Sequence, residues 1–299
     1  MSRNETGFTI RPARADDKAA VLAFCERTFE WGDYVPLVWD DWLEDEQGQL
    51  LVATDDDRPV AVAKVTLLAP AEAWLQGLRV HPQYRRHGLA QQMLGYCLDL
   101  ARQSGATVAR LATSSRNKAV QKTTERAGMR RAAAVWILAA NALAPTANTP
   151  ALTPLAPADW ARVSERILGS ASLAAQGGLC GVWDWQELTL ARLRVCLERG
   201  QVLGLVHGGI LVATALITEV NEEEKYLAIG CAEGDEAHIH GLAHALRGYA
   251  HSLGLEHLGV CVPSGSQLQL DFLNSGYQPD SESEADIWIY ELHLKGTTS

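Results

Sequence analysis

Two arginines and a glycine lie where an apolar, strand-like segment gives way to a helix-like one. Residues 74–80 are short and largely apolar, Pro82 ends strand pairing, and apolar residues recur at helical spacing from Gly88 onward. The first turn of a helix offers unpaired N–H groups and a partial positive charge. Arg85 and Arg86 add full charges there, and Gly88 lets the backbone approach a ligand closely. The pattern therefore predicts a binding site for a pyrophosphate.

The segments around this turn predict an alternating α/β domain. Short apolar runs bounded by polar turns indicate strands, and apolar residues at a helical period indicate helices. In chain order the pattern predicts strands over 8–11, 50–54, 60–68, 74–80 and 108–113, and helices over 13–29, 88–104 and 117–127. The basic turn thus connects the central strand to its own helix.

Length, charge and composition exclude several classes of protein. With 299 residues the chain can form two domains with buried cores. Its net charge of −10 argues against a nucleic-acid interface, and its six cysteines include no C-x-x-C pair, which indicates buried thiols in a reducing compartment. No apolar run approaches the ~20 residues that cross a bilayer, and Met1–Thr9 carries no apolar signal core. We expect a cytoplasmic monomer or homodimer without nucleic-acid or membrane partners.

The chain contains an internal repeat around a linker. Residues 141–151 are rich in Ala, Pro, Thr and Asn, which is typical of a linker. Beyond them, residues 152–159 echo 10–17 at an offset of 142, and the tetrapeptide His-Gly-Leu-Ala of 87–90 returns at 240–243, an offset of 153. Two echoes in the same order predict two tandem copies of one fold.

The second copy lacks the residues that would bind phosphate. At the offset of 153 the positions of Arg85 and Arg86 are taken by His238 and Ile239, which follow an acidic stretch at 233–236 that we expect to be a loop. Acidic side chains repel phosphate, so we expect the second half to be structural or to complete a pocket.

Three histidines of the second half share one predicted helical face. They are His240, His244 and His251. The first two have the i, i+4 spacing of a ligand pair, but the third lies two turns, roughly 10 Å, further along the helix, too far to share a metal ion with the first. We therefore expect a solvated polar face and no metal.

The basic turn and a later helix resemble the two cofactor segments of the GNAT acetyltransferases. The first segment has the pattern V-x-P followed by [QR]-x-x-G-x-[GA], and the residues that fill it are Val80, Pro82, Arg85, Gly88 and Ala90. The second has the pattern N-x-x-[AV]-x-x-x-Y-x-x-x-G-[FM], and the residues that fill it are Asn117, Val120, Gly128 and Met129. Thr124 stands at the tyrosine position of this second pattern.

The resemblance implies a fold and a co-substrate. The implied fold class is α/β, with two tandem GNAT-fold domains, each a mixed, mostly antiparallel sheet flanked by helices. A catalytic domain would occupy 1–140, a linker 141–151 and a degenerate domain 152–299, with the cofactor cleft where the central strands separate after Val80. The implied co-substrate is acetyl-CoA, without a metal. Its implied contacts are Leu78, Arg79, Val80, Arg85, Arg86, His87, Gly88, Leu89, Ala90 and Asn117.

A mixed run of acids and aromatics at 30–43 is the candidate acceptor site. In GNAT relatives the segment between the first two helices walls the acceptor pocket. Here the spacing of D-Y-[VL]-P before a W-L pair resembles histidine N-acetyltransferases, in which an acidic residue would hold the ammonium of an amino acid. Asp33 and Tyr34 are the candidate acceptor residues, and Trp39 and Trp42 fit either the pocket or the core.

The sequence does not assign the residues that would transfer protons. Relatives often place a glutamate base two residues before the L-x-V of the central strand, but here this residue is Gln76, and an amide cannot take a proton. Glu72 acting through a water, or Asp33, are the candidate bases. Thr124 replaces a tyrosine that protonates the leaving thiolate in many relatives. Because a thiol has a pKa of ~8–9, the thiolate can leave without this acid, and we expect its loss only to slow the reaction.

These residues imply an acetyl-CoA-dependent N-acetyltransferase acting on the primary amine of a small molecule, such as histidine. The replaced base and acid keep one alternative open, a non-catalytic acyl-CoA-binding sensor or binding module of GNAT fold. A purely structural tandem protein would not bind acetyl-CoA, and the intact basic turn at 85–90 speaks against it.

Overall fold

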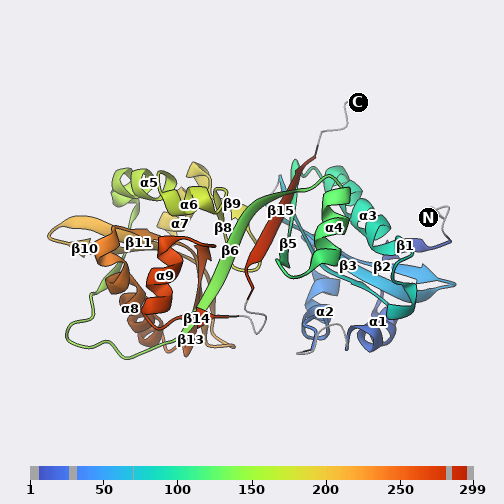
Figure 1. The fold of residues 1–299 in the computed structure, drawn as a ribbon, viewed down its shortest axis with the longest axis horizontal. Helices are drawn as coiled ribbons and strands as arrows, with labels where there is room; N and C mark the ends of the chain where they lie inside the picture. Colours follow the sequence, from blue (N-terminus) through green and yellow to red (C-terminus); the bar gives the residue numbers. More distant parts are fainter. Residues whose placement is uncertain (1–6, 27–31, 70, 281–284, 295–299) are drawn as a thin grey trace. The chain divides into compact units, whose positions relative to one another are not determined.

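The chain folds into two compact units. The computed structural model describes residues 7–26, 32–69, 71–280 and 285–294. The first unit comprises Met1–Thr113, Asn117–Arg130 and Tyr290–Ser299, and the second comprises Ser114–Arg116 and Arg131–Ile289 (Figure 1). These units group residues by contact, and so divide the chain differently from the repeat-based boundaries at 140 and 152. Within the described ranges, no helix is both long and apolar enough to cross a membrane.

The first unit is built on a mixed sheet. Its strands, in spatial order, are β1 (Thr9–Pro12), β2 (Gly48–Asp55), β3 (Arg58–Ala69), β4 (Glu72–Val80), β5 (Val108–Ser114) and, from Tyr290 onward, β15 (Ile287–His293). The pairs from β1 to β4 are antiparallel, whereas β4 and β5 are parallel. Parallel neighbours need a crossover, and α3 provides it.

Helices cover both faces of this sheet. They are η1 (Ala15–Asp17), α1 (Lys18–Cys25), α2 (Val35–Glu44), η2 (Pro82–Tyr84), α3 (Leu89–Gln103) and α4 (Lys118–Arg126). In Figure 1, α1 and α2 lie on one side of the sheet and α3 on the other. The elements predicted for this half are present, with ends that differ by a few residues. The helix predicted over 13–29 begins as the 3-10 turn η1 and continues as α1 to Cys25, and its predicted residues 27–29 lie outside the described ranges.

The second unit repeats this arrangement. Its strands, in spatial order, are β7 (Leu152–Pro154), β10 (Val202–His207), β11 (Ile210–Asn221), β12 (Tyr226–Gly234), β13 (His257–Pro263) and β6 (Arg130–Asn141), with β14 (Gln278–Pro279) also paired to β6. The central pair β12–β13 is parallel and the other pairs are antiparallel. Both sheets are therefore mixed and mostly antiparallel, as predicted.

Helices also flank the second sheet. They are η3 (Pro157–Asp159), α5 (Trp160–Leu168), α6 (Ala171–Ala175), α7 (Leu190–Glu198), α8 (Glu236–Ser252) and α9 (Gln267–Asn274), and a small sheet of β8 (Leu179–Cys180) and β9 (Gln186–Glu187) follows α6. In Figure 1, α5 to α7 lie on one side of the sheet, and α8 and α9 on the other.

Both units begin with the same capped turn. The Asp17 carboxylate accepts a hydrogen bond from the backbone N of Arg14 at 2.8 Å, and the Asp159 carboxylate accepts one from the backbone N of Ala156 at 2.8 Å. Each bond satisfies a backbone N–H that a helix start leaves without a partner. The echo at an offset of 142 is therefore a structural repeat.

All six cysteines are free and buried. Burial disfavours the thiolate, and it raises the pKa of Cys25, Cys97, Cys231 and Cys261 to about 12. We therefore expect no rapid reaction of the native protein with a chromogenic disulfide reagent at pH 8, and six thiols per chain after unfolding in guanidinium. Fast labelling of the native protein would contradict the observed burial. The same inertness leaves a low background for assays of thiol release.

Candidate active site

The central strand of the first unit carries a bulge. On β3 and β4, Val62 pairs with Arg79 and Lys64 pairs with Gln76, so Gly77 and Leu78 together face one residue of β3. Gly77 has a φ of +66°, a left-handed conformation that glycine adopts at little cost. A bulge leaves backbone groups outside the ladder, and here the Leu78 oxygen accepts a hydrogen bond from Arg79 at 3.2 Å.

The strands β4 and β5 separate before this bulge. Their parallel pairs run only from Glu72 with Val108 to Trp74 with Arg110, although both strands continue for several residues. The split thus begins six residues earlier than the predicted separation after Val80. The bulge shortens and twists β4 relative to its neighbours, which is a local reason for the early split.

The basic turn, residues 85–88, follows β4 after His81 and η2, and it ends at the residue before α3. Arg86 and Gly88 both have positive φ, of +68° and +80°, and Gly88 is the N-cap residue of α3. Arg85 bonds back to β4, because its Nε donates to the Val80 oxygen at 3.0 Å. The turn residues 85–88 are exposed. The predicted strand–turn–helix geometry is therefore present, with both arginines accessible at a helix N-terminus.

The turn itself rests on two other elements of the first unit. The His81 ring meets the ring of Phe24 on α1 at 5.7 Å, and the Tyr84 hydroxyl donates to Asp55, in the turn between β2 and β3, at 2.8 Å. These contacts fix the path of the chain between β4 and α3.

The second predicted cofactor segment begins with a helix cap. The Asn117 side chain accepts a hydrogen bond from the Val120 backbone N at 3.2 Å, so Asn117 is the N-cap of α4. This role satisfies one orphan N–H group and fixes the start of the helix.

The three predicted proton-transfer residues lie in different surroundings. The Glu72 carboxylate binds the Arg110 guanidinium, and it lies roughly 20 Å from Leu78 along β4 at 3.3 Å per residue. Gln76 lies beside the bulge, opposite Lys64. Thr124 is 1% exposed, and its hydroxyl has no hydrogen-bond partner among the described residues. A hydroxyl buried in this way is poorly placed to protonate a thiolate that faces solvent.

The candidate acceptor residues lie against the bulged strand. The Asp33 carboxylate binds Arg79 through two hydrogen bonds, from Nε at 2.7 Å and from a terminal nitrogen at 3.1 Å, and it also accepts the Val35 backbone N at 3.1 Å. The Arg79 guanidinium lies 5.2 Å from the centre of the Tyr34 ring. Burial raises the pKa of the Tyr34 phenol, although the Arg79 charge opposes this rise. The phenol is therefore neutral near pH 7.

The two tryptophans of α2 differ in their roles. Trp39 is fully buried in a core that includes Val21, Val52 and Val62. Trp42 is partly buried and packs on the bulge, because a Cβ placed on Gly77 would lie 2.5 Å from its ring. Trp39 is therefore a core residue, whereas Trp42 covers the bulge.

A second ion pair, at the end of α2, was not predicted from the sequence. Lys64 on β3 is 0% exposed, and its Nζ lies 2.6 Å from the Asp45 carboxylate and 3.1 Å from the Trp42 oxygen. Burial lowers the pKa of Lys64, against the pull of Asp45. The available signal was a lysine inside the apolar run of β3, because lysine is almost never fully buried unless it is paired.

The second unit has no counterpart of the basic turn. Between Gly234, the end of β12, and Glu236, the start of α8, stands Asp235 alone. Gly241, the counterpart of Gly88 in the repeated tetrapeptide, lies inside α8. The acidic stretch at 233–236 is thus not a loop, as the sequence suggested, but a strand end, an N-cap and a helix start.

The split in the second sheet is filled by the unit's own side chains. Parallel pairing of β12 and β13 ends at Ile229 with Val260. At the next residues, the Gln176 amide nitrogen lies 3.3 Å from the Gly230 oxygen and 3.2 Å from the Cys261 sulfur. Gln176 is 0% exposed. This split has no room for a ligand at its apex.

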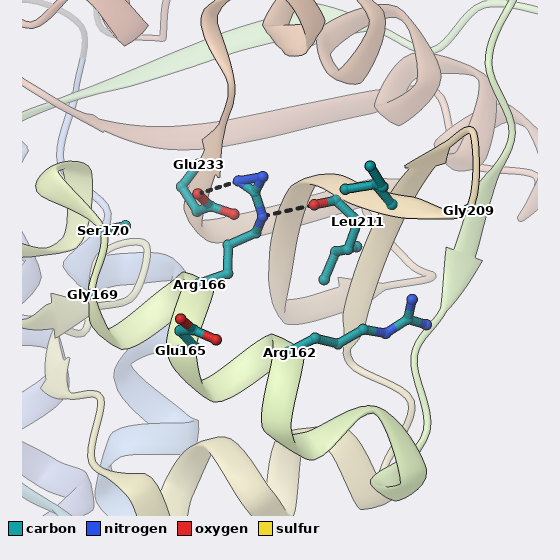
Figure 2. Close-up of a pocket in the computed structure, with 9 residues that line it drawn as sticks. Arg162, Glu165, Arg166, Gly169, Ser170, Gly209, Leu211 and Glu233 are labelled. Carbon is teal, nitrogen blue, oxygen red and sulfur yellow. Dashed lines mark hydrogen bonds and ion pairs between the residues drawn. The ribbon is translucent and has the colours of Figure 1, made fainter.

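A pocket of about 590 Å³ marks the place of the missing turn. Its lining includes Arg166 on α5, together with Gly209 and the first two residues of β11, which correspond by the repeat offsets to Phe24 and to the turn beside Asp55. Those are the elements that carry the basic turn in the first unit. Figure 2 shows Arg166 between the Glu233 carboxylate and the Leu211 oxygen, at 3.3 and 3.0 Å. The pocket therefore follows from the shortened connection.

The histidines of α8 show no metal-binding geometry. His240 contacts the Ser275 hydroxyl at 2.8 Å through Nδ1. Across the described part of the chain, no group of three His, Cys, Asp or Glu side chains is arranged to hold a metal ion.

Comparisons with known proteins match these features. Residues 18–129 match the model of the Acetyltransferase (GNAT) family. Over 100 residues the chain is 27% identical to the histidine N-acetyltransferase of Oreochromis niloticus and 26% identical to that of Scomber australasicus. Each match covers 33% of this chain and 30% of the relative, so the chain spans less than a third of the length of these relatives.

Solved structures match over the whole chain. A GCN5-related N-acetyltransferase from Sphaerobacter thermophilus aligns with a TM-score of 0.65 and 17% identity, covering 97% of this chain and 96% of the other. A tandem GNAT protein from the clavulanic acid biosynthesis pathway aligns with a TM-score of 0.56 and 15% identity, covering 95% and 98%. These likenesses confirm the predicted fold of two tandem GNAT units. The family model lies within the first unit, which has the fold of these acetyltransferase structures.

Proposed function

We propose that the protein is an acetyl-CoA-dependent N-acetyltransferase acting on the primary amine of a small molecule, with an amino acid such as histidine as the favoured acceptor. The observation that carries this proposal is the bulged strand β4, split from β5 and followed, after η2, by the exposed turn of Arg85, Arg86 and Gly88. The similarity of 100 residues to histidine N-acetyltransferases supports the acceptor class.

Binding of acetyl-CoA follows from the chemistry of the turn. Its pyrophosphate would accept hydrogen bonds from the first backbone N–H groups of α3 and charge-assisted bonds from Arg85 and Arg86. The arm of the co-substrate would then lie in the split beside β4, where Leu78 to Val80 offer backbone groups. The bulge would place an N–H donor near the thioester oxygen, where negative charge develops during the reaction.

The reaction needs a neutral amine close to the thioester. The amine nitrogen attacks the carbonyl carbon, the C–S bond breaks, and the nitrogen loses a proton to water or to a base as the CoA thiolate leaves. Asp33 is bound to Arg79 and Glu72 to Arg110, so either carboxylate would act as base from within an ion pair. Gln76, the residue beside the bulge, cannot take a proton. We therefore expect the proton to reach a base through a water molecule. The thiolate is a tolerable leaving group without a protein acid, given a thiol pKa of about 8–9.

A sensor that binds acyl-CoA without transfer is the second candidate. The observations that favour it are Gln76, which cannot take a proton, and the burial of Thr124. The two candidates share the co-substrate site and differ in turnover.

Calorimetric titration with acetyl-CoA, followed by a thiol-release assay over amino acids, polyamines and aminoglycosides, tests the proposal. We expect one acetyl-CoA per chain, because the second unit lacks the turn and fills its split with Gln176. Turnover with amino acids, histidine foremost, would support the proposed function. Binding without turnover on any amine would favour the sensor, and no binding would overturn both. Two sites per chain would contradict the assignment of the second unit.

A further inference from the structure

The link between Asp33 and Arg79 joins two elements that are distant in the chain. The Asp33 side chain is 0% exposed and the Arg79 side chain 12%. One carboxylate therefore ties the central strand β4 to the first backbone N–H group of α2, that of Val35. Burial opposes the charge on Arg79, but its hydrogen bonds to Asp33 outweigh this and raise the pKa of the guanidinium. Arg79 therefore stays protonated beside Asp33.

This pair contacts a cluster of aromatic rings at the bulge. Arg79 lies over Tyr34, Tyr34 meets Trp42 edge to face at a centroid distance of 5.8 Å, and Trp42 packs on Gly77. At the other end of α2, Asp45 binds Lys64 of β3. Two carboxylates thus fasten both ends of α2 to neighbouring strands.

The central strand of the second unit also carries a buried ion pair, but with another element. Glu233 faces Thr214 across β12 and β11 as Arg79 faces Val62 across β4 and β3. Glu233 is buried and binds Arg166 on α5. Because Arg166 corresponds to Phe24 on α1, this pair is not a copy of the link between Asp33 and Arg79.

The geometry of Asp33 argues against direct binding of an ammonium group. Both of its oxygens already accept hydrogen bonds, from Arg79 and from the Val35 backbone. An incoming ammonium would have to displace a bidentate guanidinium, which is among the strongest partners of a carboxylate.

We propose that Asp33 is a positioning residue that acts through Arg79 to hold Tyr34 and the start of α2 over the β4 bulge, and that it does not bind the ammonium of the acceptor. This inference rests on the proposed function, since the acceptor is the amine of that reaction. In this proposal the acceptor contacts the surface formed by Tyr34 and the start of α2, and not the Asp33 carboxylate itself.

A double-mutant cycle of Asp33→Asn and Arg79→Gln tests the inference. We expect each change to lower kcat/KM by about 10- to 100-fold through misplaced geometry, and the double variant to be no worse than the poorer single variant. Arg79→Lys keeps the charge but not the two-pronged hydrogen bonding of the guanidinium, so it should give a smaller loss. This variant replaces the others if they fold poorly. Asp40→Asn is the matched control, because Asp40 lies on the same helix in an exposed pair with Lys18.

A direct role in binding predicts a different pattern. Asp33→Asn would then raise KM alone, and Arg79→Gln would free the carboxylate and lower the KM for amines. Additive losses or a lowered KM would overturn the inference.

Hydrogen exchange gives a readout that does not need turnover. We expect faster exchange in peptides covering 33–45 and 72–80 in each single variant, with the rest of the first unit unchanged. Wild-type protection in both segments would overturn the positioning role. If the wild-type protein binds acetyl-CoA but transfers nothing, the proposed function fails, while exchange still decides whether Asp33 holds the segment.

Discussion

Replacing Arg85 and Arg86 together with alanine is expected to weaken acetyl-CoA binding about 30- to 100-fold. Charge-assisted hydrogen bonds contribute about 1.5–3 kcal/mol each when fully formed, and exposure to water discounts this at the protein surface. A combined loss of about 2–3 kcal/mol corresponds to the expected change in Kd. Titration calorimetry at low and high salt measures it, and the variant should also lose salt dependence.

The matched control for this pair is Arg102→Ala. Arg102 lies in the last turn of the same helix, α3, where it forms an exposed pair with Asp99. We expect unchanged acetyl-CoA affinity for the control and near-wild-type thermal stability for both variants, because residues 85 and 86 are exposed. Equal affinity in the double variant and the wild type would refute the pyrophosphate site.

Replacing Gly77 with alanine is expected to destabilise the first unit and to abolish most turnover. The φ of +66° costs a residue with a Cβ about 1–2 kcal/mol, and the new Cβ would lie 2.5 Å from the Trp42 ring. Overpacking adds about 1–3 kcal/mol and pushes α2 away from the bulge. We therefore expect about 2–5 kcal/mol less stability by chemical denaturation, and a fall in kcat of about 100-fold.

Two further variants separate the bulge from a general effect of added volume. Gly95→Ala, inside α3 with open space around its Cβ, should stabilise the protein by about 0.5–1 kcal/mol. Trp42→Leu should restore part of the stability when combined with Gly77→Ala, because the two side chains compete for one space. Wild-type stability and kcat in Gly77→Ala would show that the bulge does not have this geometry.

Local chemistry made the strand, turn and helix around the basic turn predictable. Pro82 ends strand pairing, glycine tolerates the left-handed conformation at position 88, and the apolar period of α3 follows at once. Neighbours in sequence are neighbours in space here, so spacing alone predicted the geometry. The tandem repeat was visible for the same reason, since 10–17 and 152–159 form the same capped turn.

Pairs distant in sequence were not predictable in this way. Asp33 and Arg79 are 46 residues apart, and the sequence showed an acid available for a ligand where the structure shows an ion pair. The amide of Gln176 fills a split next to Cys261, 85 residues further along the chain. Side-chain type gives the charge of a group, but only packing decides which opposite charge it meets.

The tetrapeptide His-Gly-Leu-Ala separates the two kinds of information most clearly. At 87–90 it ends the basic turn with Gly88 at a φ of +80°, whereas at 240–243 it lies inside α8. The sequence by itself determined the two copies, their order and the basic turn of the first. The tertiary structure decided that the second copy has no turn. A single residue connects Gly234 to α8, so Gly241 continues a helix instead of ending a turn.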